Sequence, residues 1–211
     1  MNRRQFLTLT SCALLLSQHS ASAKVVLRPD SFASRLYITV QAAPSEHDIR
    51  AVESSVFHFE SASDATLAVS YLSSKRESED RGEIYISNVE LIEDVPEQIA
   101  NSSWFATYTT IAGVAAFKTQ HAHAIFANAG LLHEIAVTSE DVAVASELLL
   151  DLANTVLATT DREDGLWGHL VDLKDLPDNL VLYEQFSTEG TFNSEGTPIP
   201  GEIPEWDQIG Y

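Results

Sequence analysis

Residues 121–137 decide the fold, and they read HAHAIFANAGLLHEIAV. Two short apolar segments, residues 121–127 and 131–137, flank Asn128-Ala129-Gly130. Asn and Gly in a short gap between apolar segments predict a β-hairpin, because both residues tolerate the positive φ angles of tight hairpin turns. We therefore expect two antiparallel strands here, within residues 103–137, which form the most β-like part of the chain.

A long helix is predicted directly after this hairpin. Ser139 is a suitable cap, and Glu140 and Asp141 place acidic groups where the positive end of a helix dipole favours them. Apolar residues then recur at helical spacing as far as about Ala158. They are Val142, Ala145, Leu148, Leu149, Leu152 and Val156. The spacing indicates a helix with one face in the core, and nothing in it suggests chemistry.

Shorter signals on either side complete the predicted fold. Alternating apolar residues predict strands at residues 34–43, 52–60, 82–93 and 180–183, and a helix-start signal precedes a short helix at residues 65–72. A helical turn is expected at residues 95–100. We predict a single α+β domain, an antiparallel sheet with its helices packed on one face. This order of elements resembles small exported sensor or ligand-binding domains of bacteria.

The first residues of the chain carry an export signal. Arg3 and Arg4 are followed by Gln5 and then by Phe6 and Leu7. A paired arginine, one further residue and Phe-Leu resemble the twin-arginine leader of exported bacterial and archaeal proteins. The resemblance implies passage through the twin-arginine translocase, with a final location in the periplasm, on the cell surface or outside the cell.

The leader is expected to end before Lys24. Its apolar stretch, residues 6–16, is about half the roughly twenty residues that a membrane-spanning helix needs. Ala21 and Ala23 form the small-x-small pattern of a signal peptidase site. We therefore divide the chain into a signal peptide (1–23), an α+β extracytoplasmic domain (24–186) with no transmembrane helix, and a poorly ordered acidic tail rich in Gly and Pro (187–211).

A second interpretation applies to the same leader. Leu9-Thr10-Ser11-Cys12 resembles a lipoprotein cleavage box, in which the cysteine is acylated and becomes the new N-terminus. Cys12 lies close to the arginines, however, and the most apolar residues follow it. Lipidation at Cys12 would favour a structural or envelope-associated role.

Composition excludes several classes of function. Cys12 is the single cysteine of the 211 residues, so a protein cleaved before Lys24 has no thiol nucleophile, disulfide or cysteine metal ligand. The chain has 12 basic and 31 acidic residues, a net charge of −19, and losing Arg3 and Arg4 leaves 10 basic residues and a net charge of −21. Such a charge disfavours nucleic acid and anionic lipid as partners.

Three histidines in the hairpin form the candidate metal site. His121 and His123 are two residues apart, so they share one face of a strand. With a three-residue loop at residues 128–130, His133 lies on the same face and near His123, an arrangement that suits zinc. A two-residue loop shifts the register by one, pairs His123 with Glu134 and separates His133 from the other two.

No motif of a known catalytic mechanism is found in the sequence. It lacks a Gly-x-Ser-x-Gly elbow, a glycine-rich phosphate loop and a metalloprotease helix motif. The first hypothesis is thus a non-enzymatic exported domain that binds a small ligand or a protein partner through the open face of its sheet. The alternative is a zinc-binding protein, or a metal-dependent enzyme, that uses His121, His123 and His133.

Overall fold

The computed structural model describes residues 29–39, 49–78, 84–112, 117–159, 165–187 and 190–192. The predicted leader lies outside these residues. Its export signal (Arg3, Arg4, Phe6, Leu7), its cleavage site (Ala21, Ala23) and Cys12 therefore stay predictions from sequence.

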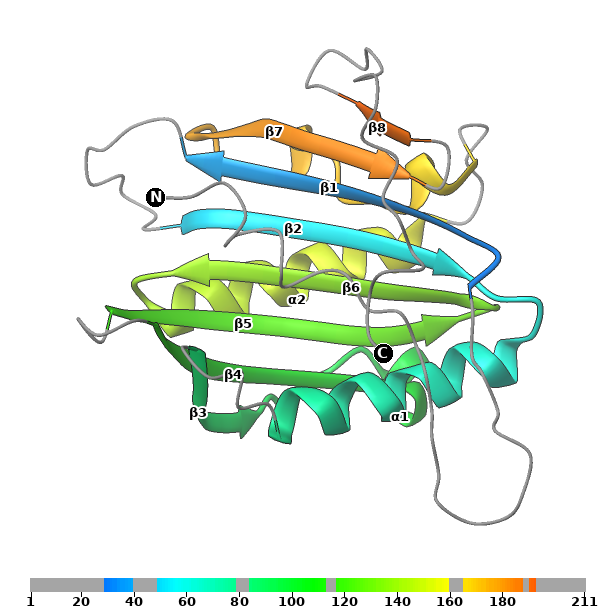
Figure 1. The fold of residues 1–211 in the computed structure, drawn as a ribbon, viewed down its shortest axis with the longest axis horizontal. Helices are drawn as coiled ribbons and strands as arrows, with labels where there is room; N and C mark the ends of the chain where they lie inside the picture. The colour runs from blue at the N-terminus through cyan, green and yellow to red at the C-terminus, as the bar shows by residue number, and fades with distance from the viewer. Residues whose placement is uncertain are drawn as a thin grey trace.

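The described residues form one eight-stranded sheet, in the order β3-β4-β5-β6-β2-β1-β7-β8 (Figure 1). The strands are β1 Ser31–Thr39, β2 Ile49–His58, β3 Ile84–Leu91, β4 Ser103–Ala112, β5 Phe117–Asn128, β6 Leu131–Ser139, β7 Leu180–Ser187 and β8 Gly190–Phe192. Every neighbouring pair is antiparallel. The pairing of β6 with β2 joins the β3–β6 meander to the rest of the sheet.

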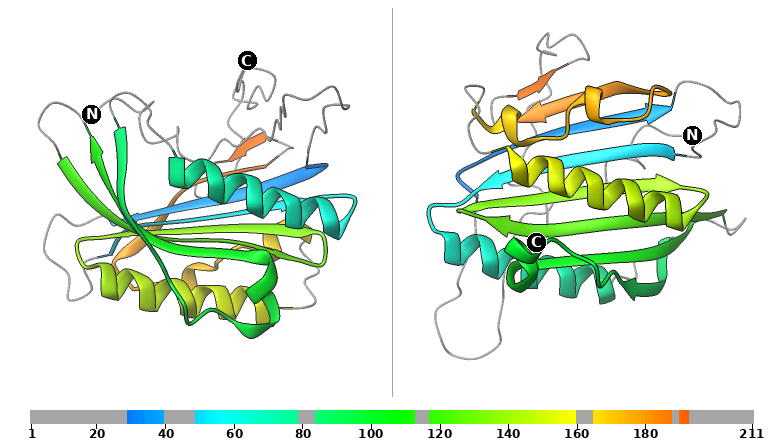
Figure 2. Two further views of the ribbon diagram at one scale, coloured as in Figure 1. Left: turned by 90° about the horizontal axis from the view of Figure 1, so that it is seen from below. Right: turned by 180° about the vertical axis from the view of Figure 1, so that it is seen from behind.

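Two long helices pack against the sheet, one on each face (Figure 2). They are α1, Ala62–Ser78, and α2, Val142–Ala158. Side chains alternate between faces along a strand, and on β5 Ile125 and Ala127 join the core under α1 while Ala124 and Phe126 join the core under α2. Among the described helices, none is long and apolar enough to cross a membrane.

The predicted class is confirmed: a single α+β domain built on an antiparallel sheet with helices packed against it. The expectation that both helices cover the same face was wrong. From Ala122 to Ala127, β5 is apolar on both faces except for His123, and each face needs a cover that excludes water. The predicted tail also begins too early, because Ser187 ends β7 and residues 190–192 form β8, while residues 193–211 lie outside the described part.

Helix α2 begins where the sequence predicts it, but with a different cap. The Asp141 carboxylate accepts hydrogen bonds from the backbone N–H of Ala143 at 2.8 Å and of Val144 at 3.4 Å. Ser139 is the last residue of β6, and its hydroxyl oxygen accepts from the Asp141 N–H at 3.0 Å. Ser139 thus supports the capping residue, and Asp141 satisfies the first free N–H groups of the helix.

The hairpin between β5 and β6 has a two-residue turn. Asn128 pairs with Leu131, which leaves Ala129 (φ 49°) and Gly130 (φ 85°) as the turn residues. Two positive φ angles match the right-handed twist of the flanking strands. A Cβ on Gly130 would lie 3.3 Å from the Phe59 carbonyl oxygen, and the Gly130 carbonyl accepts a 2.9 Å hydrogen bond from the Phe59 N–H. Glycine is therefore required at position 130.

A segment of short 3-10 turns lies beside α2 on the same face (Figure 2). It contains η4, Gly165–His169, and η5, Leu173–Asp175. Val171 fixes it to the sheet: its carbonyl accepts from the Tyr37 hydroxyl at 2.7 Å, and its N–H donates to the Ser54 hydroxyl at 3.1 Å. A further 3-10 turn, η3 (Glu97–Ser102), buries Ile99 in the α2-side core.

Candidate functional site

A buried polar network surrounds His123 on the α1 face of the sheet. Its Nε2 lies 2.9 Å from Oε1 of Glu134 on β6, and its Nδ1 lies 3.2 Å from the hydroxyl of Tyr108 on β4. Trp104 packs edge-on against the imidazole, with ring centroids 5.6 Å apart. A neutral imidazole satisfies both contacts when Nε2–H donates to the carboxylate and Nδ1 accepts from the tyrosine.

His121 extends the same network toward the end of the sheet. Its Nε2 lies 2.8 Å from the Thr110 hydroxyl and its Nδ1 lies 3.2 Å from the Thr138 hydroxyl. Its ring stacks on Tyr108, with centroids 5.1 Å apart. Both ring nitrogens of His121 and of His123 are thus engaged by protein groups.

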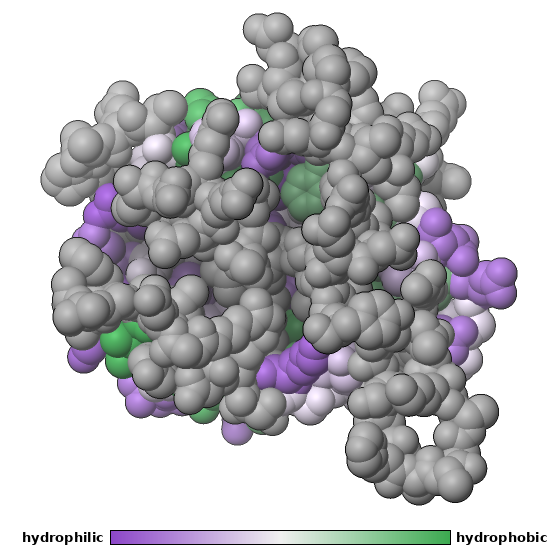
Figure 3. Space-filling view, in the orientation of Figure 1, coloured by the Kyte–Doolittle hydropathy of each residue, from purple (hydrophilic) through white to green (hydrophobic). Residues whose placement is uncertain are grey.

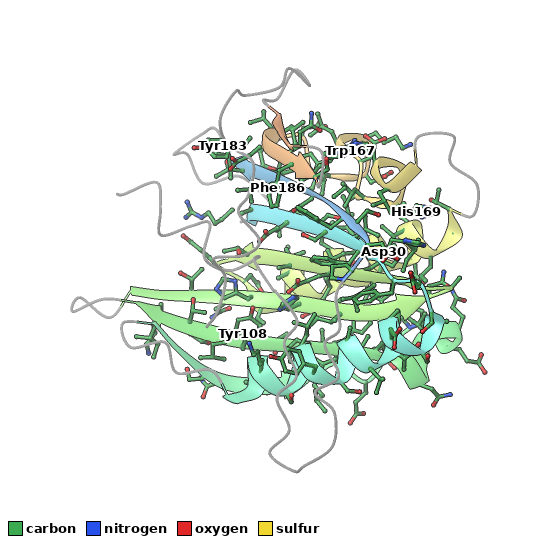
Figure 4. All side chains as sticks on the ribbon, turned by 45° about the vertical axis from the view of Figure 1, so that its right-hand side comes forward. Asp30, Tyr108, Trp167, His169, Tyr183 and Phe186 are labelled. Carbon is green, nitrogen blue, oxygen red and sulfur yellow. The ribbon has the colours of Figure 1, made fainter. Side chains whose placement is uncertain are left out.

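His133 lies on the opposite face of the sheet. Its ring stacks on Phe126, with centroids 4.9 Å apart, and lies 6.2 Å from the ring of His169 on η4. Burial, with a smaller contribution from His169, lowers the pKa of His133 to about 3. Figure 4 labels two residues of these separate regions, Tyr108 on β4 and His169 on the segment beside β1 and β2.

The predicted three-histidine zinc site is therefore not formed. The turn has two residues, as in the alternative interpretation, but its register pairs His123 with Ala136 and not with Glu134. As that alternative expected, His133 is separated from His121 and His123. The contact with Glu134 is diagonal, because Ala136 stands directly opposite His123. Within the described ranges, no group of three or more His, Cys, Asp or Glu residues is arranged to hold a metal ion.

The histidine network reads as a structural feature of the core. The side chains of His123 and Glu134 are only 2% and 4% exposed. Buried polar groups of this kind are normally hydrogen-bonded, and here hydroxyls and a carboxylate supply partners for the imidazoles.

A different polar region lies on the α2 face, at the end of the sheet where β5 begins and β6 ends. Ser87, Thr109, Gln120 and Ser139 stand directly opposite one another on β3, β4, β5 and β6. They form one row across four strands, which we call the polar row. Farther along the same face, several residues of β5 and β6 belong to the core under α2, namely Ala122, Ala124, Phe126, Ile135 and Val137. The polar row adjoins this core.

The polar row forms the floor of an open pocket of about 400 Å³. Arg50, Lys118 and Glu140 contribute charged groups to its lining. Asn88, Thr119 and Ile111 complete the walls. Asn88 adopts φ 54° at the irregularity that separates the two paired parts of β3. Gln120 Oε1 is buried and has no hydrogen-bond partner among the described residues.

The pocket gathers positive charge in an acidic chain. Arg50 forms an ion pair with Glu140, and no described residue forms an ion pair with Lys118. Two other basic side chains have partners outside the pocket. Arg35 lies over the Trp167 ring at 5.6 Å, and Lys174 pairs with Asp172 at 3.5 Å. Among the described residues, the pocket lining therefore carries two basic groups and one acidic group.

Sequence reasoning missed this pocket. Its described residues come from five strands and from the link between β6 and α2, and none belongs to a recognisable motif. One signal was present: Gln120 lies shortly before the apolar residues 124–127, and Ser139 lies shortly after the apolar residues 135–137. That signal becomes informative only when the register places the two residues opposite each other.

Exposed apolar side chains give no rival binding surface among the described residues. The large ones, Leu67, Leu91, Val142, Leu173 and Tyr183, come from five different elements. Where described residues reach the surface in Figure 3, hydrophilic and hydrophobic groups are interspersed. Scattered apolar residues of this kind are normal on a protein surface.

Comparisons with known proteins leave the function open. No protein-family model matches the chain, and neither does any curated protein. Among solved structures, the extracellular domain of PknH from Mycobacterium tuberculosis matches with 11% identity and a TM-score of 0.36, over 58% of this chain and 64% of that one. A Pseudomonas aeruginosa protein of unknown function, PA94, matches with 10% identity and a TM-score of 0.31, over 70% and 96%. The match to PknH spans less than two thirds of that domain, and neither score establishes a shared fold.

Proposed function

We propose that this chain is an exported domain that binds a small polar ligand in the pocket above the polar row. The observation that carries the proposal is the pocket itself, which combines an open volume of about 400 Å³ with a floor of four hydrogen-bonding side chains. Pockets that bind small molecules commonly have volumes of about 300–1,000 Å³. Binding here requires no rearrangement of the core.

The chemistry of the floor favours a ligand with several polar groups. Three hydroxyls and one amide can each donate and accept hydrogen bonds. Gln120 Oε1 would gain a partner from a donor group on the ligand. A buried acceptor without a partner costs free energy, so a ligand that supplies the donor gains affinity at this position.

Ligand binding can be tested by thermal-shift screening of the purified full chain against small polar metabolites. A compound present at about one hundred times its Kd should stabilise the protein by about 2.7 kcal/mol, or roughly 5–10 °C in Tm. Gln120→Met should abolish most of the shift, because it removes the amide and keeps the length of the side chain. Gln98→Met, at an exposed position on η3, is the matched control. Equal shifts for the native chain and Gln120→Met would contradict the pocket as the binding site.

The export part of the proposal is supported by the order of the leader's features. Arg3 and Arg4 precede a short apolar stretch, and Ala21 and Ala23 follow it. The absence of cysteine after Cys12 suits an oxidising compartment.

Export can be tested in a bacterial host with an intact twin-arginine translocase. Mass spectrometry of the exported protein should find the N-terminus at Lys24, and replacing both Arg3 and Arg4 with lysine should leave the precursor in the cytoplasm. An N-terminus at an acylated Cys12 would replace the signal-peptidase proposal with the lipoprotein one. Unprocessed protein in the cytoplasm of cells that express the native leader would contradict export.

A further inference from the structure

We propose that the pocket selects a small carboxylate carrying a single negative charge and one or more hydroxyl groups. This inference rests on the proposed function and specifies the chemical class of its ligand. Three features of the pocket support it: the charge balance of the lining, the position of the basic groups relative to the polar row, and the buried acceptor on Gln120.

The first feature is the charge balance. Glu140 neutralises Arg50 through their ion pair, and Lys118 has no ion-pair partner among the described residues. The described part of the lining therefore has one uncompensated positive charge, although the whole chain carries −19. One carboxylate on the ligand would balance Lys118. A doubly charged phosphate ester would bring excess negative charge close to Glu140, which would repel it.

The second feature is the order of the groups along the strands. Lys118 and Gln120 are two residues apart on β5, so they share the α2 face, with Lys118 nearer the end of the sheet. Arg50 adjoins Ile49, which pairs with Ser139 at the end of the polar row. Basic groups thus stand at the rim, and hydrogen-bonding groups form the floor. A ligand with an anionic end and a hydroxylated body matches this order.

The third feature is the direction of the missing hydrogen bond. Gln120 Oε1 is an acceptor, so its ligand partner must be a donor. A hydroxyl group can donate to Gln120 and also accept from a serine or threonine of the polar row. A simple carboxylate without hydroxyls, such as acetate, has no donor for this position.

The test is isothermal titration of the purified full chain with D-gluconate, D-glucose and inorganic phosphate at the same ionic strength. Gluconate should bind at least about tenfold more tightly than glucose, because the carboxylate adds a charge-assisted hydrogen bond. Phosphate should bind more weakly than gluconate. Glucose binding as tightly as gluconate would overturn the need for a negative charge, and a preference for phosphate would overturn the carboxylate class.

Lys118→Gln and Glu140→Gln should change the affinity for gluconate in opposite directions. Lys118→Gln should weaken gluconate binding about tenfold or more, whereas Lys174→Gln on η5 should leave it unchanged. Glu140→Gln should tighten gluconate binding severalfold, because Arg50 then has no acidic partner in the pocket. A damaged fold cannot produce tighter binding, so this second variant separates charge selection from misfolding. Unchanged affinity in both Lys118→Gln and Glu140→Gln would overturn the inference.

The outcomes also distinguish this inference from the proposed function. If gluconate fails to bind while neutral or cationic compounds give thermal shifts that depend on Gln120, the pocket is a binding site for another class of ligand and the inference is wrong. If no compound gives a shift that depends on Gln120, the proposed function is wrong and the inference is wrong with it.

Discussion

Replacing Glu134 with alanine should lower the free energy of unfolding by about 3–5 kcal/mol, the cost of removing one member of a buried interacting pair. The His123 Nε2, 2.9 Å from the carboxylate, would lose this partner in a position where its side chain is 2% exposed. The lost volume adds a cavity beneath neighbouring core residues. Urea denaturation of the variant and the native chain, monitored by tryptophan fluorescence, measures the difference.

Glu140→Ala is the control for this experiment. Glu140 directly follows β6 and is exposed, so its removal should cost less than about 1 kcal/mol, a value typical of a surface ion pair. Equal destabilisation by the two replacements would show that the buried pair of His123 and Glu134 stabilises the fold no more than the exposed ion pair of Arg50 and Glu140.

A double-mutant cycle isolates the contact between the two side chains. His123→Phe leaves a buried carboxylate without its imidazole partner, so this single replacement should also be costly. Combining it with Glu134→Leu should cost clearly less than the sum of the single replacements, because the pair then becomes apolar on both sides. Additive costs would mean that the imidazole and the carboxylate act independently.

The parts of the fold that the sequence predicted well have strong local signals. The 3.6-residue spacing of apolar side chains placed the end of α2 at Ala158, where the structure has it. Asn and Gly between two apolar segments placed the β5–β6 hairpin. These features depend on interactions between residues close in the chain, and such interactions leave a pattern in the sequence.

The parts that the sequence did not predict depend on register and on cover by distant elements. The turn consists of Ala129, at φ 49°, and Gly130, whereas the sequence suggested that Asn128 also belongs to the loop. Alanine adopts this conformation at a cost. That one-residue difference moved His133 to the other face. The two-sided burial of β5 was readable in the run from Ala122 to Ala127, which is apolar on both faces except for His123. This pattern indicates that a helix covers each face of β5, whereas the predicted fold placed both helices on one face.

The pocket depends on long-range pairing to a still greater degree. Ser87 and Ser139 are far apart in the chain, and only the pairing of β3, β4, β5 and β6 puts them in one row. Each is an ordinary strand residue by itself. Their shared role as a pocket floor comes from the sheet, so no local pattern could predict it.

Acid should destabilise the protein through His133, and this is the second large effect that we expect. Burial lowers the pKa of His133 from 6.5 to about 3 in the folded state, with a smaller contribution from His169. Between these two values the unfolded chain binds a proton that the folded chain does not, so stability falls as the pH falls. Each pH unit is worth 1.36 kcal/mol, which gives about 3 kcal/mol lost between pH 6.5 and pH 4. Above pH 6.5 the contribution of His133 should be constant.

His133→Gln tests this assignment, because glutamine does not titrate and can still hydrogen-bond to the backbone of His169. The variant should lose about 3 kcal/mol less than the native chain between pH 6.5 and pH 4, whatever its stability at neutral pH. Urea denaturation at several pH values measures both slopes. Equal slopes for the native chain and His133→Gln would show that His133 is protonated in the folded state as readily as in the unfolded chain, which its position between the Phe126 ring and His169 argues against.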